Sequence, residues 1–367
     1  MREESTPPGH GGALPGVGNS HPARFPAARR RTVCQEDRVS IPKVELSPPF
    51  NITRSSHVRY RVRDLDKSLR FYTEVLGLVV SDQEDGVAYL RGIEESCHHS
   101  VVLVASEDGP SAECLGMRVA SEDDLHRARD HFIAAGGSAE FVERAHQGPT
   151  LLTSFGPGTP PIELCSSMPV LPRLLNNFPA QKGGRALRLD HYQCAVPDVP
   201  GTVAKFMALG FRPSKYTTHV ETGKLLSIFL TRKNNPHDLV LAQAAGPRLH
   251  HVAFVVSDLQ TMLRAADIAG NLGYGRDVEH GPGRHGPPNG VFLYFRDPDG
   301  HRIEFILPPM QFMDPEDVPN AWDSTQGVSL VPWGGGPPQQ WREQMTHFTG
   351  IEPAGGPLAR WTSLSGT

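Results

Sequence analysis

Hydrophobic and polar positions follow the same order four times along this chain. Each time, a short alternating run leads into an amphipathic helical stretch, which ends near a glycine and is followed by three strand-like runs. The first helical stretch shows the spacing clearly, with Leu69, Tyr72, Val75 and Leu76 at three- and four-residue steps. The four openings are SHVRYRVRDLDKSLRFYTEVLGL from Ser56, CLGMRVASEDDLHRARDHFIAAGG from Cys114, DHYQCAVPDVPGTVAKFMALGF from Asp190 and HHVAFVVSDLQTMLRAADIAGNLGY from His250. The pattern predicts a βαβββ unit that is repeated four times.

The repeats predict two domains, each made of two units. We expect an N-terminal domain over 54–168 and a second domain over 185–307, joined by the stretch MPVLPRLLNNFPAQKGG. Residues 1–50 are rich in Pro, Gly and Arg and have few large apolar side chains, so we expect a disordered extension. Residues 308–367 follow the last repeat as a C-terminal segment.

Composition narrows the class of protein. The chain has 367 residues, of which 38% are hydrophobic, and its net charge of −4 comes from interspersed acidic and basic residues. We therefore expect a soluble globular protein that binds small molecules, with no nucleic-acid partner and no membrane span. The five cysteines show no C-x-x-C spacing, which argues against a disulfide framework and a thiolate zinc site and favours a reducing cytoplasm.

Alignment of the repeats yields candidate metal ligands. The first strands place four residues at one position: His57, Gly116, His191 and His251. The last strands, PPIELC and HRIEFI, place Glu163 and Glu304 at another. His191, His251 and Glu304 would form the two-histidine, one-carboxylate face that binds divalent iron or manganese and leaves the opposite positions open. A single histidine on a strand is more often structural, but three candidate ligands at repeat-equivalent positions favour a metal site.

Two further expectations follow from this alignment. Gly116 removes the second imidazole from the N-terminal domain, so we expect no metal there. Neighbouring residues on a strand point to opposite faces, so His250 and His251 cannot both bind one metal. The match with His191 selects His251 as the ligand and leaves His250 as a neighbour that packs beside the site or lines the pocket.

The fourfold repeat resembles the vicinal oxygen chelate superfamily, over about 54–307. The run GPGRHGPPNGVFLYFRDPDGHRIEF, residues 281–305, closely resembles type I extradiol catechol dioxygenases, especially the homoprotocatechuate 2,3-dioxygenase branch. RLDHYQCAVPDVP, GPRLHHVAF and TRKNNPHDLVL match the same branch in order. The resemblance implies an α+β fold of four βαβββ modules paired into two domains with a C-terminal lid. It also implies Fe(II), with Mn(II) as the alternative, a homotetramer, and a catechol and O2 as substrates.

The same resemblance implies roles for individual residues. His237 matches the acid–base histidine, His285 a histidine at the substrate mouth, and Tyr294 the tyrosine that orients the substrate oxygen. From the residues alone, His237 in NNPHD fits a solvated loop and Tyr294 fits the core. His301, after the DPDG turn, fits an exposed turn position.

The chain departs from the family at the pocket. Gln193 replaces an Asn and Phe229 replaces a Trp, so both are expected to line the pocket. Ser329 and Leu330 stand where the lid carries adjacent arginines that grip a substrate carboxylate, so a neutral or differently substituted catechol is expected.

The expected reaction opens the ring beside the diol and yields a yellow 2-hydroxymuconic semialdehyde-type product, in the catabolism of aromatic compounds. The alternatives are a 4-hydroxyphenylpyruvate dioxygenase-like enzyme, a non-redox glyoxalase-type isomerase, and a catalytically silent binding protein of the same fold.

Overall fold

Each predicted unit forms a strand, a helix and three more strands in the computed structural model, which describes residues 41–286, 289–314, 316–323 and 331–355. The first unit contains β1 (Ile52–Val62), α1 (Leu65–Arg70), a π-helical turn (Phe71–Val75), β2 (Val79–Glu84), β3 (Val87–Arg91) and β4 (Val101–Ala105). The second contains β5 (Ser111–Val119), α2 (Glu122–Ala134), β6 (Ser138–Val142), β7 (Thr150–Ser154) and β8 (Ile162–Cys165).

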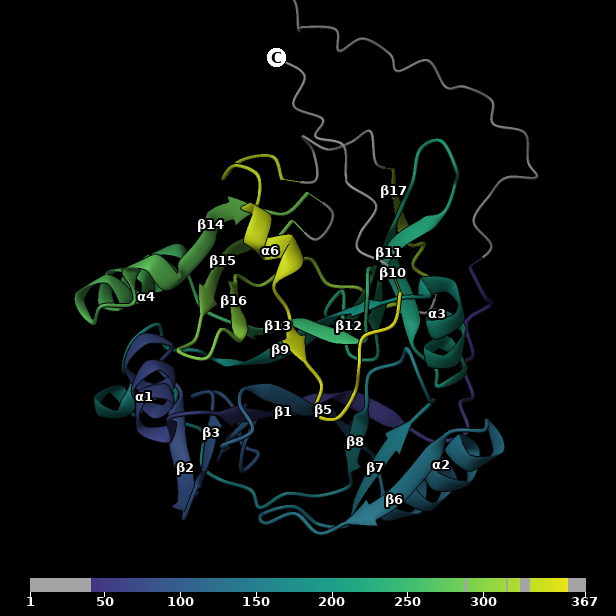
Figure 1. The fold of residues 1–367 in the computed structure, drawn as a ribbon, viewed down its shortest axis with the longest axis horizontal. Coiled ribbons are helices and arrows are strands. Elements are labelled where there is room, and N and C mark those ends of the chain that lie inside the picture. The colour runs from purple at the N-terminus through teal and green to yellow at the C-terminus, as the bar shows by residue number, and fades with distance from the viewer. Residues whose placement is uncertain (1–40, 287–288, 315, 324–330, 356–367) are drawn as a thin grey trace, which may run out of the picture. The chain divides into compact units, whose positions relative to one another are not determined.

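The second half of the chain repeats this order (Figure 1). The third unit contains β9 (Arg188–Val196), α3 (Val199–Ala208), β10 (Arg212–Thr218), β11 (Leu225–Thr231) and β12 (Leu239–Gln243). The fourth contains β13 (Arg248–Val255), α4 (Leu259–Asn271), β14 (Val278–Arg284), β15 (Val291–Arg296) and β16 (Arg302–Ile306).

The four main helices begin in the same way because a short polar side chain caps each of them. The cap side chain accepts a hydrogen bond from a backbone N–H three residues further along, which satisfies a donor that the helix leaves unpaired. The caps are Asp64, Ser121, Asp198 and Asp258. A cap at the end of each opening strand therefore fixes the turn from strand to helix.

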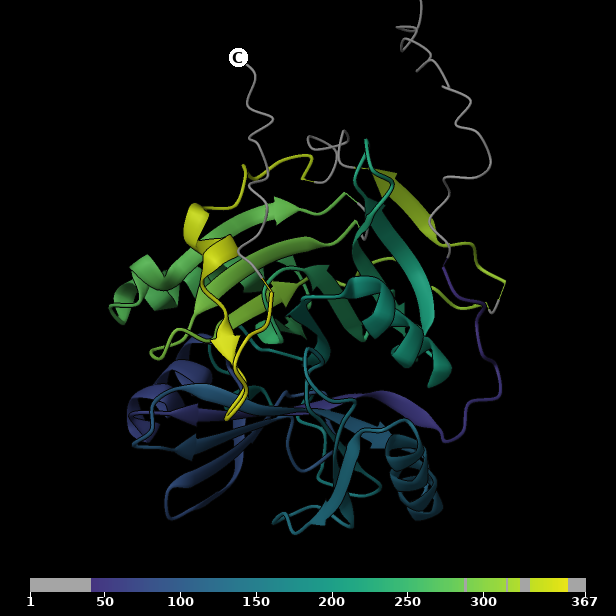
Figure 2. The same cartoon turned by 45° about the vertical axis from the view of Figure 1, so that its right-hand side comes forward.

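The strands form two sheets that lie against each other in residues 39–367 (Figure 2). One sheet has the order β2-β3-β4-β1-β5-β8-β7-β6, and the other runs β14-β15-β16-β13-β9-β12-β11-β10-β17. The Tyr192 hydroxyl joins them by donating to the carbonyls of His57 and Gly116, at 2.8 and 2.7 Å. In each sheet, the opening strands of the two units are neighbours at the centre, with β1 beside β5 and β9 beside β13.

The strand pairing at the centre of each sheet corrects one of the predicted matches between the repeats. His57 lies opposite Gly116 in β1–β5, and His191 lies opposite Ala253 in β9–β13. Gly116 also pairs with Glu163, as Ala253 pairs with Glu304. Gly116 therefore matches Ala253, and the residue that matches His251 is Cys114. The predicted match of Gly116 with His251 was wrong by two residues, a slip that keeps every side chain on its face and so leaves the hydrophobic pattern unchanged.

Both ends of the described chain pack onto this framework. Ile41 and Val44 contact the core and Phe50 is buried, so packed structure begins before the predicted boundary at residue 50. The C-terminal segment forms β17 (Asn320–Asp323) beside β10, a short helix α6 (Gln339–Glu343), and β18 (Thr346–His347) beside β13. Ser329 and Leu330, the positions expected to carry the lid arginines, lie outside the described residues.

This C-terminal segment covers a residue that was expected to be exposed. His301 is only 1% exposed, stacks on Tyr60 with 4.2 Å between ring centroids, and hydrogen-bonds the Thr346 hydroxyl at 2.9 Å. The prediction of an exposed turn histidine was therefore wrong, because β18 folds back over the DPDG turn.

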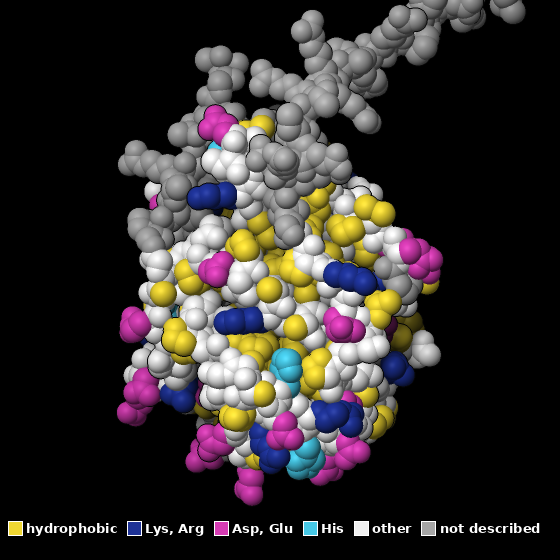
Figure 3. Space-filling model, turned by 90° about the vertical axis from the view of Figure 1, so that its right-hand side faces the viewer, with side chains coloured by type: hydrophobic (Ala, Val, Ile, Leu, Met, Phe, Trp, Pro, Cys, Tyr) yellow, Lys and Arg dark blue, Asp and Glu magenta, His cyan; other side chains and the backbone are white. Residues whose placement is uncertain are grey.

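The surface carries charges of both signs. On the face shown in Figure 3, acidic and basic side chains are interspersed with small apolar areas, and no continuous basic patch forms. Within the described part of the chain, no helix has the length and hydropathy needed to cross a membrane.

Candidate metal centre and catalytic site

Three neighbouring strands bring the predicted ligands together. His191 lies on β9, His251 on β13 and Glu304 on β16, and these strands are consecutive in the second sheet. The Nε2 atoms of the two histidines are 3.2 Å apart, and each is 3.2 Å from Glu304 Oε2. All three side chains are buried. Residues separated by up to 113 positions thus present three ligand atoms at the corners of one small triangle.

Asp190 fixes the orientation of the first histidine. Its Oδ2 lies 2.8 Å from His191 Nδ1, and since a carboxylate can only accept, Nδ1 carries the hydrogen. Asp190 is itself held by the side chain of Asn235. The His191 Nε2 lone pair therefore faces Glu304, an arrangement typical of metal-binding histidines.

A longer chain of hydrogen bonds fixes the second histidine. His250 Nε2 lies 2.9 Å from the Trp341 carbonyl, which can only accept, so Nε2 carries the hydrogen and Nδ1 accepts. The partner of that Nδ1 is His251 Nδ1 at 2.7 Å, which must donate. His251 Nε2 is thereby left with its lone pair toward Glu304. Both ring nitrogens of His250 are used in this chain, which favours a positioning role over the predicted pocket-lining one.

These three groups fit a divalent metal. Two lone pairs and a carboxylate oxygen meet at 3.2 Å, which is unfavourable unless a cation lies between them. The spacing matches adjacent corners of an octahedron with bonds of roughly 2.3 Å, and the donor set is the two-histidine, one-carboxylate face. His191, His251 and Glu304 would hold the metal.

The protonation of the cluster supports the same interpretation. Burial lowers the pKa of His251 to about 4, so this imidazole is neutral and able to bind metal. Burial raises the pKa of Glu304, but the neighbouring imidazoles of His251, His191 and His285 outweigh it and hold the pKa well below its usual range, so Glu304 is an ionised carboxylate. Burial also lowers the pKa of His191, but Asp190 and Glu304 outweigh it and raise the pKa, so a proton is the competing occupant of the cluster.

His237 lies directly beside the first ligand. Its ring centroid is 4.0 Å from that of His191 and 5.2 Å from that of Phe229. The side chain is buried, and Nδ1 has no hydrogen-bond partner. Burial, with the neighbouring charges of His191 and Lys215, lowers the pKa of His237 well below its ordinary value. His237 is thus a neutral base in a dry site and not a solvated loop residue.

Tyr294 and His285 lie on the other side of the carboxylate. His285 Nε2 is 3.1 Å from Glu304 Oε1 and 3.2 Å from the Tyr294 hydroxyl. Tyr294 is opposite Glu304 in the β15–β16 pairing. Burial raises the pKa of Tyr294 well above its usual value, so its hydroxyl keeps its proton and can donate.

The predicted pocket residues Gln193 and Phe229 lie on β9 and β11. Gln193 pairs with His251 across β9–β13, and Phe229 contacts His237. Lys215 lies over the face of the Phe229 ring, with its side-chain nitrogen 4.1 Å from the ring centroid. Both predicted residues therefore lie beside the group of His191, His251 and Glu304.

The sequence interpretation missed three residues of this site. Asp190 orients His191, and its place just before a candidate ligand was the available signal. Trp341 packs on His250 with 4.3 Å between ring centroids, but nothing local connects it with β13. Lys215 is fully buried and its nitrogen has no hydrogen-bond partner, whereas a lysine in an alternating strand is usually solvated.

The equivalent position in the N-terminal domain is filled by protein groups. His57 Nε2 lies 2.8 Å from Glu163 Oε1, and the Arg144 guanidinium lies 2.8 Å from Oε2. Gln147 also donates to Glu163, and the Cys114 thiol is 3.6 Å from it. A guanidinium thus neutralises Glu163 where a metal would be needed in the other domain. The imidazole that is missing from this position would be at Cys114.

Comparison with known proteins places this site in a family. The sequence model of the Glyoxalase/Bleomycin resistance protein/Dioxygenase superfamily matches residues 54–155 and 188–305, which together form most of the chain. The chain belongs to this superfamily. The first matched segment runs from β1 to β7 and the second from β9 to β16, and the family assignment made from the repeats is confirmed.

Two curated relatives are dioxygenases of similar length. Metapyrocatechase from Pseudomonas sp. (strain CF600) is 27% identical over 282 residues, covering 69% of this chain and 85% of the relative. The manganese-dependent 2,3-dihydroxybiphenyl 1,2-dioxygenase of Geobacillus genomosp. 3 is 25% identical over 300 residues, covering 77% and 94%.

Solved structures agree in fold with this chain. Homoprotocatechuate 2,3-dioxygenase from Arthrobacter globiformis superposes with a TM-score of 0.80 and 30% identity, covering 87% of this chain and 98% of that one. The Brevibacterium fuscum enzyme, solved as an anaerobic complex with 3,4-dihydroxyphenylacetate, gives 0.78 and 31%, covering 84% and 96%. The predicted α+β fold of paired modules is confirmed, and the chain is an oxidoreductase of the dioxygenase type. The predicted metal cofactor agrees with the ligand group of His191, His251 and Glu304 and with the manganese dependence of the Geobacillus relative.

Proposed function

We propose that this chain is an extradiol dioxygenase that opens a catechol ring next to its two hydroxyl groups. The observation that carries the proposal is the triangle of His191 Nε2, His251 Nε2 and Glu304 Oε2, each pair 3.2 Å apart. A bound Fe(II) or Mn(II) supplies a Lewis-acidic centre whose open positions can chelate both catechol oxygens and admit dioxygen beside them.

The residues around the triangle can perform the proton steps. His237 is a neutral base beside His191 and is placed to take the proton of the second catechol hydroxyl and to return it later. Tyr294 keeps its proton and can donate to a substrate oxygen, while His285 holds Tyr294 and Glu304 in place. The base and the donor lie on different sides of the ligand triangle, so both can act on one bound diol.

The charges near the pocket support a catechol without a carboxylate. Arg296 and Arg302, on the strands that carry Tyr294 and Glu304, are both bound to Glu279, at 3.0 and 2.6 Å. His280 occupies the pocket side of β14 with its ring stacked 5.8 Å from that of Tyr294, and burial lowers its pKa to about 4. A neutral histidine and two paired arginines offer no charged fork to a carboxylate. The product would be a 2-hydroxymuconic semialdehyde-type compound, formed in the catabolism of aromatic compounds.

One alternative is kept because it uses the same three ligands, namely a 4-hydroxyphenylpyruvate dioxygenase-like reaction on a 2-oxoacid. A silent binding protein is disfavoured by the retention of His237 beside a complete ligand set. A cytoplasmic homotetramer remains part of the proposal from family resemblance.

Oxygen uptake tests the proposal. Protein loaded anaerobically with iron is mixed with matched catechols, one neutral and one bearing a carboxylate, and with 4-hydroxyphenylpyruvate. We expect oxygen consumption and a yellow product with the neutral catechol and a weaker response with the carboxylate. Oxygen consumption with carbon dioxide release from the 2-oxoacid alone would contradict the proposal, as would catechol binding without oxygen uptake.

A further inference from the structure

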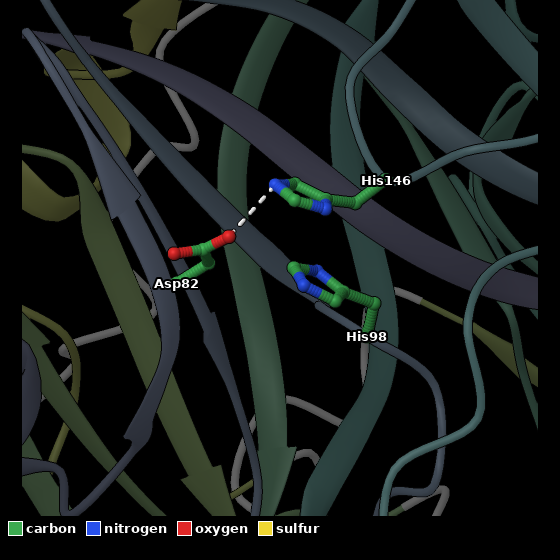
Figure 4. A group of neighbouring side chains, drawn as sticks. All are labelled: Asp82, His98 and His146. Atoms are coloured by element: carbon green, nitrogen blue, oxygen red, sulfur yellow. Dashed lines mark ion pairs between the residues drawn. The ribbon is translucent and has the colours of Figure 1, made fainter.

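A second group of metal-binding side chains lies in the N-terminal domain, away from Glu163. It contains Asp82 on β2, His98 just before β4, and His146 in the connection from β6 to β7 (Figure 4). One ligand atom from each lies within 4.8 Å of the other two. His146 Nε2 is 3.1 Å from Asp82 Oδ2 and 3.1 Å from Glu84 Oε1, so a fourth donor adjoins the group.

The group links one edge strand of the N-terminal sheet to the loop that follows the other edge strand. β2 and β6 are the first and last strands in the order of the N-terminal sheet, and His146 follows β6 by four residues. The connection from β6 to β7 reaches β2, where His146 and Asp82 form an ion pair (Figure 4). A shared ligand at this point would therefore tie this connection to β2.

A chain of hydrogen bonds prepares His98 to bind a cation. Gln147 Nε2 donates to Glu163 at 3.1 Å, so its Oε1 is the acceptor for His99 Nε2 at 3.2 Å. His99 Nδ1 must then accept from His98 Nδ1 at 3.1 Å. This leaves a lone pair on His98 Nε2, for which the described residues provide no hydrogen bond.

The same device fixes the ligand histidine of the catalytic domain. There, the Trp341 carbonyl accepts from His250, and His250 accepts from His251. In both domains, two consecutive buried histidines are joined by a hydrogen bond between their Nδ1 atoms. The second nitrogen of one ring donates to a carbonyl oxygen, so the Nε2 atom of the other ring, His251 or His98, carries no proton. In the N-terminal domain, the rings of His98 and His146 are also stacked with 4.1 Å between centroids, which places both histidines at the same opening.

Charge and access also suit a cation. The His98 side chain is buried, while those of Asp82 and Glu84 are 45% and 49% exposed and that of His146 is 25% exposed. One face of the group thus opens to solvent and carries two carboxylates, and the other is a neutral imidazole on a rigid strand connection. Two imidazoles and one or two carboxylates are a common ligand set for Zn²⁺ and similar borderline ions.

We propose that Asp82, His98 and His146 form a structural site for a divalent transition-metal ion of the Zn²⁺ type, with Glu84 as a further ligand. The ion would displace the proton from His146 Nε2 and clip β2 to the β6–β7 connection. This proposal replaces the expectation of a metal-free N-terminal domain, which rested on the missing second imidazole beside His57 and Glu163. It does not depend on the proposed ring-opening activity.

Zn²⁺ titration of the full-length, metal-stripped protein against a chromophoric chelator tests the site. We expect two equivalents for the wild type and one for His146→Ala and for His98→Asn. We also expect one for Glu304→Ala and none for Glu304→Ala combined with His146→Ala. His126→Ala, an exposed histidine on α2 of the same domain, is the matched control and should keep two.

Thermal unfolding of the same variants gives a readout that does not depend on activity. Zn²⁺ should raise the Tm of Glu304→Ala, and His146→Ala should abolish that rise, since an ion bound only to the folded state stabilises it. If His146→Ala and His98→Asn bind as much Zn²⁺ as the wild type, or if Glu304→Ala binds none, the proposal is overturned. His146 lies in a surface loop, so its variant should fold and keep each outcome informative.

Discussion

His250 stands behind His251 with the two Nδ1 atoms 2.7 Å apart, and its other nitrogen donates to the Trp341 carbonyl at 2.9 Å. The C-terminal segment thereby determines which nitrogen of His251 faces Glu304. Two adjacent histidines of similar burial thus have different tasks, one as proposed ligand and one as its support.

Substitutions at this pair should separate the two tasks. His251→Ala should abolish metal binding at this site, because it removes one of three ligand atoms. His250→Phe should keep one equivalent at saturating metal but weaken affinity by roughly 10- to 100-fold, since the ligand loses its orienting partner. Equilibrium dialysis with Fe(II) or Mn(II) measures both constants. Loss of metal in His250→Phe with retention in His251→Ala would mean that the ligand assignment is off by one residue.

Removal of the proposed base should affect turnover and not metal content. His237→Phe should retain one metal per chain and lose turnover by roughly 10²- to 10⁴-fold, the usual range for a general acid–base group. Iron content and steady-state oxygen uptake on the same preparation measure the two effects. His126→Phe, at an exposed position on α2, serves as the control and should remain active. Undiminished turnover in His237→Phe would remove this residue from the mechanism.

We expect Lys215 to lower the stability of the folded protein and to contribute to the reaction of the substrate. Burial lowers the pKa of its amine well below the usual value, and the nitrogen has no hydrogen-bond partner, so it is a buried polar group without compensation. Lys215→Met should therefore raise the free energy of unfolding by roughly 1–2 kcal/mol and lower kcat/KM by at least about tenfold. Denaturant unfolding and steady-state kinetics check the pair of changes, with the exposed Lys224→Met as control. A stabilised variant with full kcat/KM would show that Lys215 has no role toward substrate.

The ion pair between His57 and Glu163 should make the N-terminal domain sensitive to alkaline pH. Burial lowers the pKa of His57, but Cys165 and Glu163 outweigh it and raise the pKa to about 9. Because the folded pKa exceeds the unfolded one, near 6.5, the stabilisation is complete below that pH and is lost as the pH rises through 9.

Denaturant unfolding of the wild type and His57→Gln at pH 6 and pH 10 measures this linkage. The stability difference between the two proteins should shrink by roughly 2–4 kcal/mol over the interval. A difference that stays constant with pH would show that His57 is not charged in the folded protein.

Local patterns were sufficient to predict much of the fold and the ligand set. The alternation of apolar residues and the polar caps mark each strand-to-helix turn, and Glu304 lies in a motif that stands at the end of the fourth repeat. The match of Gly116 with His251 failed for a physical reason. A shift of two residues preserves the inward and outward faces of a strand, so only the hydrogen-bonded partners reveal Cys114 as the equivalent.

Other features depend on contacts between distant segments. Trp341 and Thr346 come to His250 and His301 because the C-terminal segment folds back over β13 and the DPDG turn. The group of Asp82, His98 and His146 exists because the connection from β6 to β7 reaches β2 beside the segment that leads into β4. No spacing of residues in the sequence predicts these contacts between distant segments.

The proposed reaction at the site built from His191, His251 and Glu304 is the insertion of both atoms of O2 into a catechol. Mass spectrometry of the product after a reaction under ¹⁸O₂ tests it most directly, on iron-loaded protein with a neutral catechol. We predict a ring-opened product heavier than the substrate by one whole O2 molecule, with label from the gas, and no such product with Glu304→Ala. A ring-opened product without label from the gas, or a labelled product from Glu304→Ala, would overturn this proposal.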